Sequence, residues 1–108
     1  MKIINIHKTV TADELLALIE LKLDRLFKEQ RQTDIHFTGE IVDGAVVISE
    51  PQLYEGFLYR IEIEGEELHI TRSEHYVDDV NSLTVESILN VLFGEIAGEQ
   101  GVTFILEG

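Results

Sequence analysis

A strand followed by a long amphipathic helix is the pattern at the start of this chain. Apolar β-branched residues dominate Lys2–His7, which predicts a strand. Thr11 and Glu14 then have the spacing of a capping box, a side-chain arrangement that opens helices. The expected helix runs from Ala12 to about Gln30. The apolar residues that recur along one of its faces are Leu15, Leu16, Ile19, Leu23, Leu26 and Phe27.

Two leucines of this helix do not fit its apolar face. Leu18 and Leu21 fall at its flank or on its polar side. Such a pair can form the seam between two copies of the chain, although singly exposed leucines are also normal in monomers. A homodimer through Leu18 and Leu21 therefore stays open as an alternative.

The segment from 35 to 49 predicts a β-hairpin. Two apolar, strand-like runs flank the dipeptide Asp43-Gly44, which is typical of a two-residue type I′ turn. This turn would place Gly39 opposite Ile48 on the neighbouring strand. A glycine inside a strand indicates a bulge or a close approach by another part of the chain.

A second hairpin is predicted in the next alternating segment, around Gly65. A two-residue loop at either Glu64-Gly65 or Gly65-Glu66 keeps the apolar residues on one face. Both alternatives place Glu62, Glu64 and Glu67 together on the other face. We therefore expect that face to be open to water or to a partner.

The last third of the chain predicts a loop, a helix and a strand. Ser73–Ser82 is polar and is expected to form the loop. The helix is expected to begin near Leu83-Thr84, with Thr84 as its N-cap, and to end before Gly98. Val102–Leu106 is largely apolar and shows little polar alternation, which is typical of a central strand.

These elements follow the order β-α-β-β-β-β-α-β. One-faced helices and alternating strands predict an α+β fold of two layers, with two helices packed on one face of a mostly antiparallel sheet. At 108 residues the chain has the size of a single domain, which would span 1–108. With 44% apolar residues it can fill a core, and it has no cysteine for disulfides.

Charge is segregated along the chain. Residues 1–31 carry six of the eight Lys and Arg, whereas residues 32–108 carry sixteen of the 21 acids and only two arginines. The net charge of −13 disfavours direct binding to nucleic acid or to an anionic membrane, because both are recognised through clustered Lys and Arg. The absence of cysteine fits a reducing compartment, and we expect a cytoplasmic protein.

Candidate chemistry is sparse. His69 and His75, with Glu74, Asp78 and Asp79, are metal-ligating residue types, but their spacing matches no metal motif and also suits a solvated acidic loop. A metal-dependent small enzyme is thus the least favoured alternative. We expect no enzyme activity and no cofactor. His36 and His69 are expected on the open sheet face, where glutamates would make a pH-sensitive patch.

The acidic residues instead suggest a protein-binding module. Small acidic proteins such as immunity proteins, antitoxins and inhibitors that mimic DNA present such charge to a basic partner, because complementary potentials speed association. The alternative is a self-associating structural or accessory protein. Two exposed tyrosines would serve as aromatic anchors of the binding surface. The expected partner-binding residues are Tyr54, Glu62, Glu64, Glu66, Glu67, Glu74, Tyr76, Asp78 and Asp79.

Overall fold

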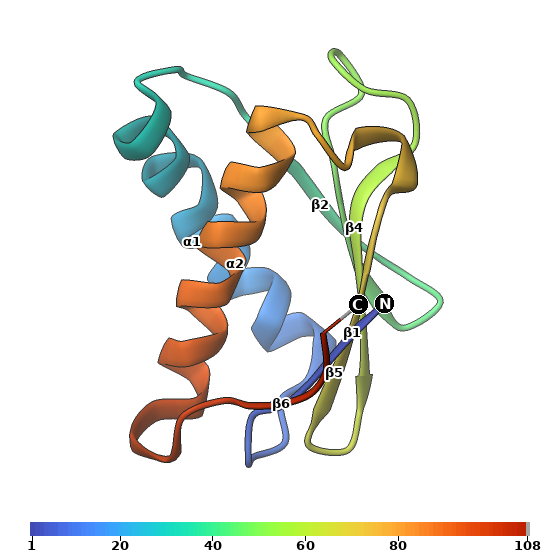
Figure 1. The fold of residues 1–108 in the computed structure, drawn as a ribbon, viewed down its shortest axis with the longest axis vertical. Coiled ribbons are helices and arrows are strands. Elements are labelled where there is room, and N and C mark those ends of the chain that lie inside the picture. The colour runs from blue at the N-terminus through green and yellow to red at the C-terminus, as the bar shows by residue number, and fades with distance from the viewer. Residues whose placement is uncertain (108) are drawn as a thin grey trace.

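The computed structural model describes residues 1–107, and within them two helices pack against one face of a six-stranded antiparallel sheet (Figure 1). The predicted two-layer α+β fold and element order are confirmed. The strands are β1 (Lys2–Asn5), β2 (Thr38–Val42), β3 (Ala45–Ser49), β4 (Phe57–Glu64), β5 (Glu67–Arg72) and β6 (Thr103–Glu107); the helices are α1 (Ala12–Arg31) and α2 (Val80–Ala97), with short 3-10 turns η1 (Glu74–Tyr76) and η2 (Gly98–Gln100).

The sheet has the strand order β2-β3-β4-β5-β1-β6. The first strand is therefore internal, between β5 and β6. The prediction that the last strand is central was wrong, because β6 forms an edge and all of its five residues are exposed. A largely apolar run does not distinguish a strand that is covered on both faces from one that is left open at an edge.

The first helix begins as the capping box predicts. Thr11 is the N-cap, and its hydroxyl oxygen accepts a hydrogen bond from the Glu14 backbone N–H at 3.1 Å. The Thr11 hydroxyl in turn donates to the Glu14 carboxylate at 3.0 Å. The helix buries Leu15, Ile19, Leu23 and Phe27, four of the six residues predicted for its apolar face.

The second helix begins at Val80, one turn before the predicted start. Its N-cap is Asp79, whose Oδ1 accepts a hydrogen bond from the Ser82 backbone N–H at 2.9 Å. Thr84 lies inside the helix and its hydroxyl donates to the Val80 carbonyl, so the prediction that Thr84 is the cap was wrong. The helix ends at Ala97, as Gly98 predicts with its φ of 66°.

The first hairpin has the predicted turn and register. Asp43 and Gly44 both have positive φ, as a type I′ turn requires, and Gly39 pairs with Ile48. A Cβ atom on Gly39 would lie 2.7 Å from Cδ1 of Leu16 on α1. The missing side chain thus allows the helix to approach this strand closely.

In the second hairpin the structure selects the loop Gly65-Glu66, because Glu64 pairs with Glu67. The alternation of β4 is interrupted near its start, where Leu58 and Tyr59 are both fully buried. A register shift between β3 and β4 at this point accounts for two consecutive buried residues.

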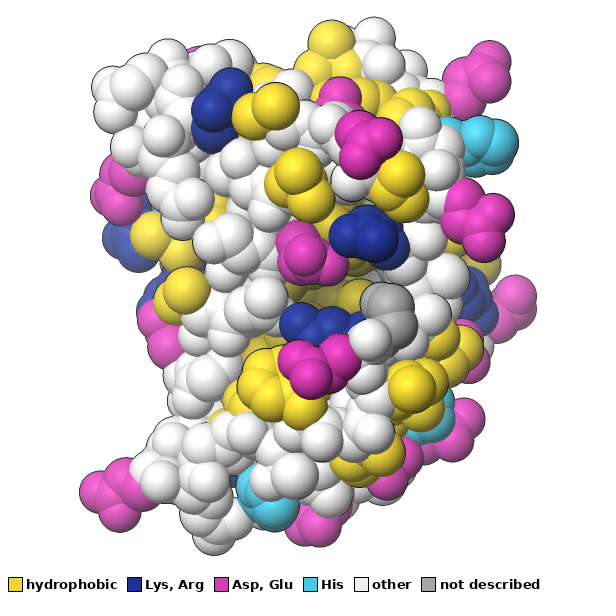
Figure 2. Space-filling model, viewed as in Figure 1, with side chains coloured by type: hydrophobic (Ala, Val, Ile, Leu, Met, Phe, Trp, Pro, Cys, Tyr) yellow, Lys and Arg dark blue, Asp and Glu magenta, His cyan; other side chains and the backbone are white. Residues whose placement is uncertain are grey.

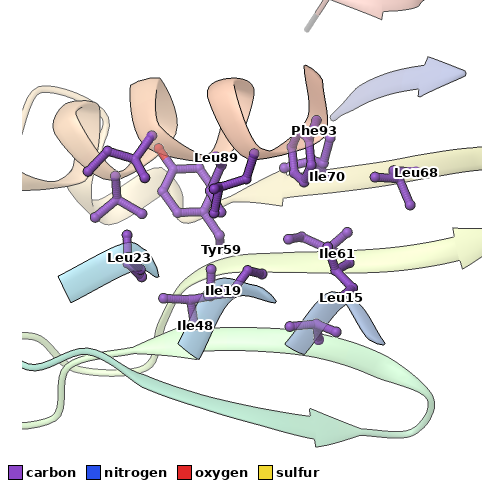
Figure 3. Packing of buried hydrophobic residues seen from close by; sticks show 14 of the residues in the cluster. Leu15, Ile19, Leu23, Ile48, Tyr59, Ile61, Leu68, Ile70, Leu89 and Phe93 are labelled. Atoms are coloured by element: carbon purple, nitrogen blue, oxygen red, sulfur yellow. The ribbon is translucent and has the colours of Figure 1, made fainter. Parts of the chain in front are cut away.

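The core lies between the helices and the sheet. Figure 3 shows α1 and α2 side chains meeting those of β3, β4 and β5, with the Tyr59 hydroxyl directed toward α2. Neither α-helix in residues 1–107 is long and apolar enough to cross a membrane. The face of the sheet opposite the helices carries Glu62, Glu64 and Glu67.

Candidate acidic interface

Four of the predicted binding residues gather at one end of the β4–β5 hairpin. The turn Gly65-Glu66 closes this end, and Glu64 stands directly opposite Glu67 on the two strands. Glu62 lies two residues before Glu64 and therefore on the same, open face. We call Glu62, Glu64, Glu66 and Glu67 the acidic end of the hairpin.

Two positively charged or titratable side chains lie among these carboxylates. Nε2 of His69 is 3.0 Å from a carboxylate oxygen of Glu67 and 3.9 Å from one of Glu64. The Arg60 guanidinium lies 3.6 Å from Glu62. His69 is thus on the open face, as predicted. One arginine and one histidine cannot balance four glutamates, so the acidic end keeps a net negative charge.

Strand pairing adds acids that were not predicted for the site. Because Val46 pairs with Ile61, the β2–β3 turn with Asp43 lies at the same end of the sheet as the acidic end of the hairpin. Glu40 shares the open face, since it pairs with Val47, which pairs with Arg60. The sequence pattern could have predicted the place of Asp43 and Glu40 only if the strand order had also been known. Figure 2 shows acidic side chains along the margin where the sheet lies in Figure 1.

The other predicted binding residues lie at the opposite end of the hairpin. The η1 turn and the residues that lead into α2 follow the far end of β5, and an eight-residue strand such as β4 spans about 25 Å. The prediction of a single acidic face therefore divides into two separate groups. The residues of this far group are Tyr54, Glu74, Tyr76, Asp78 and Asp79.

Within the far group, three residues hold the fold together. Tyr54 and Tyr76 were expected to be exposed but are half-buried, with their rings edge to face at 4.7 Å. The Tyr54 hydroxyl donates to Asp79, the N-cap of α2, at 2.8 Å. The Tyr76 hydroxyl donates to the Glu55 carbonyl and accepts from the Glu55 N–H, which anchors the β3–β4 loop. Only Glu74 and Asp78 are exposed.

The environment of two tyrosines opposes their ionisation. Burial, reinforced by the hydrogen bond to the Asp79 carboxylate, raises the pKa of Tyr54. Burial is also the main reason why the pKa of Tyr59 is raised. Both hydroxyls therefore act as hydrogen-bond donors in the folded protein at neutral pH.

The histidines do not converge. His36 precedes β2 and pairs through Nδ1 with Asp24 of α1, so its predicted place on the open sheet face was wrong. His75 lies against Tyr76, at the far end from the acidic end. In the described part of the chain, no three side chains of His, Asp or Glu are arranged to hold a metal ion.

The two leucines of the predicted dimer seam lie in different environments. Leu18 is half-buried against the core, and Lys22, one turn further along the same side of α1, pairs with Glu95 of α2 at 2.8 Å. Leu21 is 73% exposed. Leu18 therefore belongs largely to the contact between the helices, and Leu21 alone remains open to a partner.

Comparison of the chain with protein-family models, with curated proteins and with solved structures finds no match.

Proposed function

We propose that this chain is a small acidic, non-enzymatic binding module whose acidic end of the hairpin engages a basic protein surface. Immunity proteins, antitoxins and DNA-mimicking inhibitors are the classes that use charge in this way. The cysteine-free composition favours a partner in the cytoplasm. The far group of acids is not part of the proposed surface, because its tyrosines and Asp79 are engaged within the fold.

One observation carries this proposal. Glu64 and Glu67 stand opposite each other across the ladder, with Glu66 in the turn between them. Like charges in directly opposed positions destabilise a sheet. A cationic surface bound at this end would relieve that repulsion and gain the attraction of several carboxylates at once.

Reversing charge at the acidic end should slow partner binding. We expect the variant Glu64→Lys/Glu66→Lys to associate about tenfold more slowly at low salt, because steering by complementary charge contributes at least that factor. The partner is first isolated by affinity capture from lysate of the source organism at low and high salt. Association rates are then measured by surface plasmon resonance.

The matched control is Glu20→Lys/Glu29→Lys, which changes net charge equally at exposed positions of α1. It should slow association far less than the variant at the acidic end. The variant Glu64→Lys/Glu66→Lys should keep its fold, because the lysine introduced at position 64 stands opposite Glu67 and attracts it. A partner whose binding is insensitive to salt, or equal losses in both double variants, would refute the proposal.

A second candidate function, self-association, is favoured by the edge strand β6. Phe104, Ile105 and Leu106 are 53%, 51% and 48% exposed, and the outer edge of β6 has no neighbouring strand in residues 1–107. An exposed apolar edge is a template for pairing with another chain. Two copies could pair through this edge to make one continuous sheet.

Self-association through β6 should respond to salt in the opposite direction. Copies that each carry −13 repel one another, so we expect dimerisation to strengthen as salt screens the charge. Light scattering across a concentration series measures the molar mass. Ile105→Lys should abolish the dimer, and Val91→Lys, at an equally exposed position on α2, should not. A monomer at all concentrations and salts would exclude this function.

A further inference from the structure

A cavity of about 420 Å³ opens between α2 and the β1–β5 pair, away from the acidic end of the hairpin. Figure 2 shows a hollow near the middle of the visible face, with Lys or Arg side chains on two sides and hydrophobic side chains in its floor. Lys2 and Arg72 line the cavity, and Ile70 and Phe57 contribute apolar surface. Its volume lies within the range of about 300–1,000 Å³ that is usual for small-molecule sites.

Strand pairing brings the two cations together although they are seventy positions apart in the sequence. Lys2 of β1 pairs with Ile70 of β5, and Arg72 follows Ile70 by two residues. All three side chains therefore lie on the helix-facing side of the sheet. Arg72 is one of only two basic residues after residue 31, so its place beside Lys2 runs against the charge pattern of the whole chain.

Within residues 1–107, neither cation has an ion pair at hydrogen-bond distance. The Arg72 guanidinium lies 3.7 Å from the Glu86 carboxylate, which is longer than a hydrogen bond. Lys2 donates to the side-chain carbonyl of Asn90 at 2.7 Å, and that acceptor is uncharged. The Arg72 side chain is only 35% exposed. A guanidinium in this position has donors to offer to an anion that enters the cavity.

We propose that this cavity binds a small organic monocarboxylate, with its carboxylate on Arg72 and Lys2 and its apolar part over Ile70. Arginine holds a carboxylate through two parallel hydrogen bonds, a geometry that a planar anion fits. Glu86 and Glu74 also line the cavity, and they disfavour an anion of higher charge. The apolar floor favours a ligand with a short hydrocarbon tail.

Titration of the full chain with sodium butyrate, followed by the backbone amide signals in NMR spectra, tests the proposal. We expect saturable shifts centred on residues 70–73, and about tenfold weaker affinity in Arg72→Gln, the loss of one charge-assisted contact. Arg60→Gln is the matched control, because Arg60 lies on the neighbouring strand, has a single glutamate at 3.6 Å and faces the opposite side. It should bind butyrate as the unaltered protein does.

Two further titrations, at constant ionic strength, define the ligand class. Butylammonium chloride and inorganic phosphate should each bind at least about tenfold more weakly than butyrate. Shifts that never saturate, equal losses in Arg72→Gln and Arg60→Gln, or equal binding of phosphate or the amine would overturn the proposal. If Arg72→Gln fails to fold, Lys2→Gln decides, since it should weaken butyrate binding while the spectrum stays native.

Discussion

Replacing Tyr59 by alanine is expected to lower the free energy of unfolding by about 3–5 kcal/mol, the cost of deleting a fully buried aromatic side chain. Tyr59 is the largest side chain that is fully buried in the described part of the protein. It stands on β4, near the centre of the sheet, and packs among residues of both helices (Figure 3). A loss of that size is a large fraction of the roughly 5–15 kcal/mol by which native domains are stable.

The variant Tyr59→Phe separates the contribution of the Tyr59 hydroxyl to stability from that of its ring. The Tyr59 hydroxyl donates to the Ser82 carbonyl in the first turn of α2 at 3.0 Å, and the Ser82 hydroxyl donates back at 3.4 Å. Tyr59→Phe keeps the ring but leaves both Ser82 groups with a lost partner, so we expect a cost of about 1–2 kcal/mol.

Urea unfolding followed by circular dichroism measures both effects. Phe57→Ala is the control, because Phe57 lies on the same strand but is only half-buried and should cost less. A loss below about 1 kcal/mol in Tyr59→Ala would contradict the packing described here.

The elements that were predicted correctly from the sequence are those with a complete local signal. Thr11 and Glu14 lie three residues apart, and Asp43 and Gly44 are adjacent, so the conformations that they favour need no help from distant residues. The register of the first hairpin followed from its turn for the same reason.

The wrong predictions concern features that depend on residues distant in the sequence. Asp79 and Thr84 are both good N-caps, and Asp79, the cap that the structure uses, also accepts a hydrogen bond from the hydroxyl of Tyr54, 25 residues earlier. The position of β6 at the edge follows from the insertion of β1 beside β5, which leaves no strand to cover it. Neither the contact between Tyr54 and Asp79 nor the pairing of β1 with β5 can be recognised in the local pattern of apolar residues.

The same limit applies to the candidate site. The glutamates around Gly65 were grouped correctly, because a short turn holds them together. Glu74 and Asp78 are near them in sequence but follow β5, whose length carries them to the far end of the sheet. Lys2 and Arg72 are seventy positions apart and yet line one cavity. Residues that are close in the sequence are therefore close in space across a short turn, but they lie far apart when a strand separates them.

Asp79→Ala is expected to lower the free energy of unfolding by about 2 kcal/mol, whereas Thr84→Ala should change it by less than about 0.5 kcal/mol. Asp79 Oδ1 accepts hydrogen bonds from both the Ser82 N–H and the Tyr54 hydroxyl. The alanine variant removes both the cap of the helix and the hydrogen-bond acceptor of Tyr54. Thr84 only bonds to the Val80 carbonyl within the helix, where alanine is a better helix former.

Asp79→Asn distinguishes the bonds from the charge. Its side-chain oxygen can accept the same two hydrogen bonds, so most of the stability should return, apart from the attraction between a carboxylate and the helix N-terminus. Thermal unfolding of the three variants, monitored by circular dichroism, ranks them. If Thr84→Ala proved as costly as Asp79→Ala, α2 would have to begin at the cap that the sequence pattern alone suggested, and the contact between Tyr54 and Asp79 would not organise this end of the molecule.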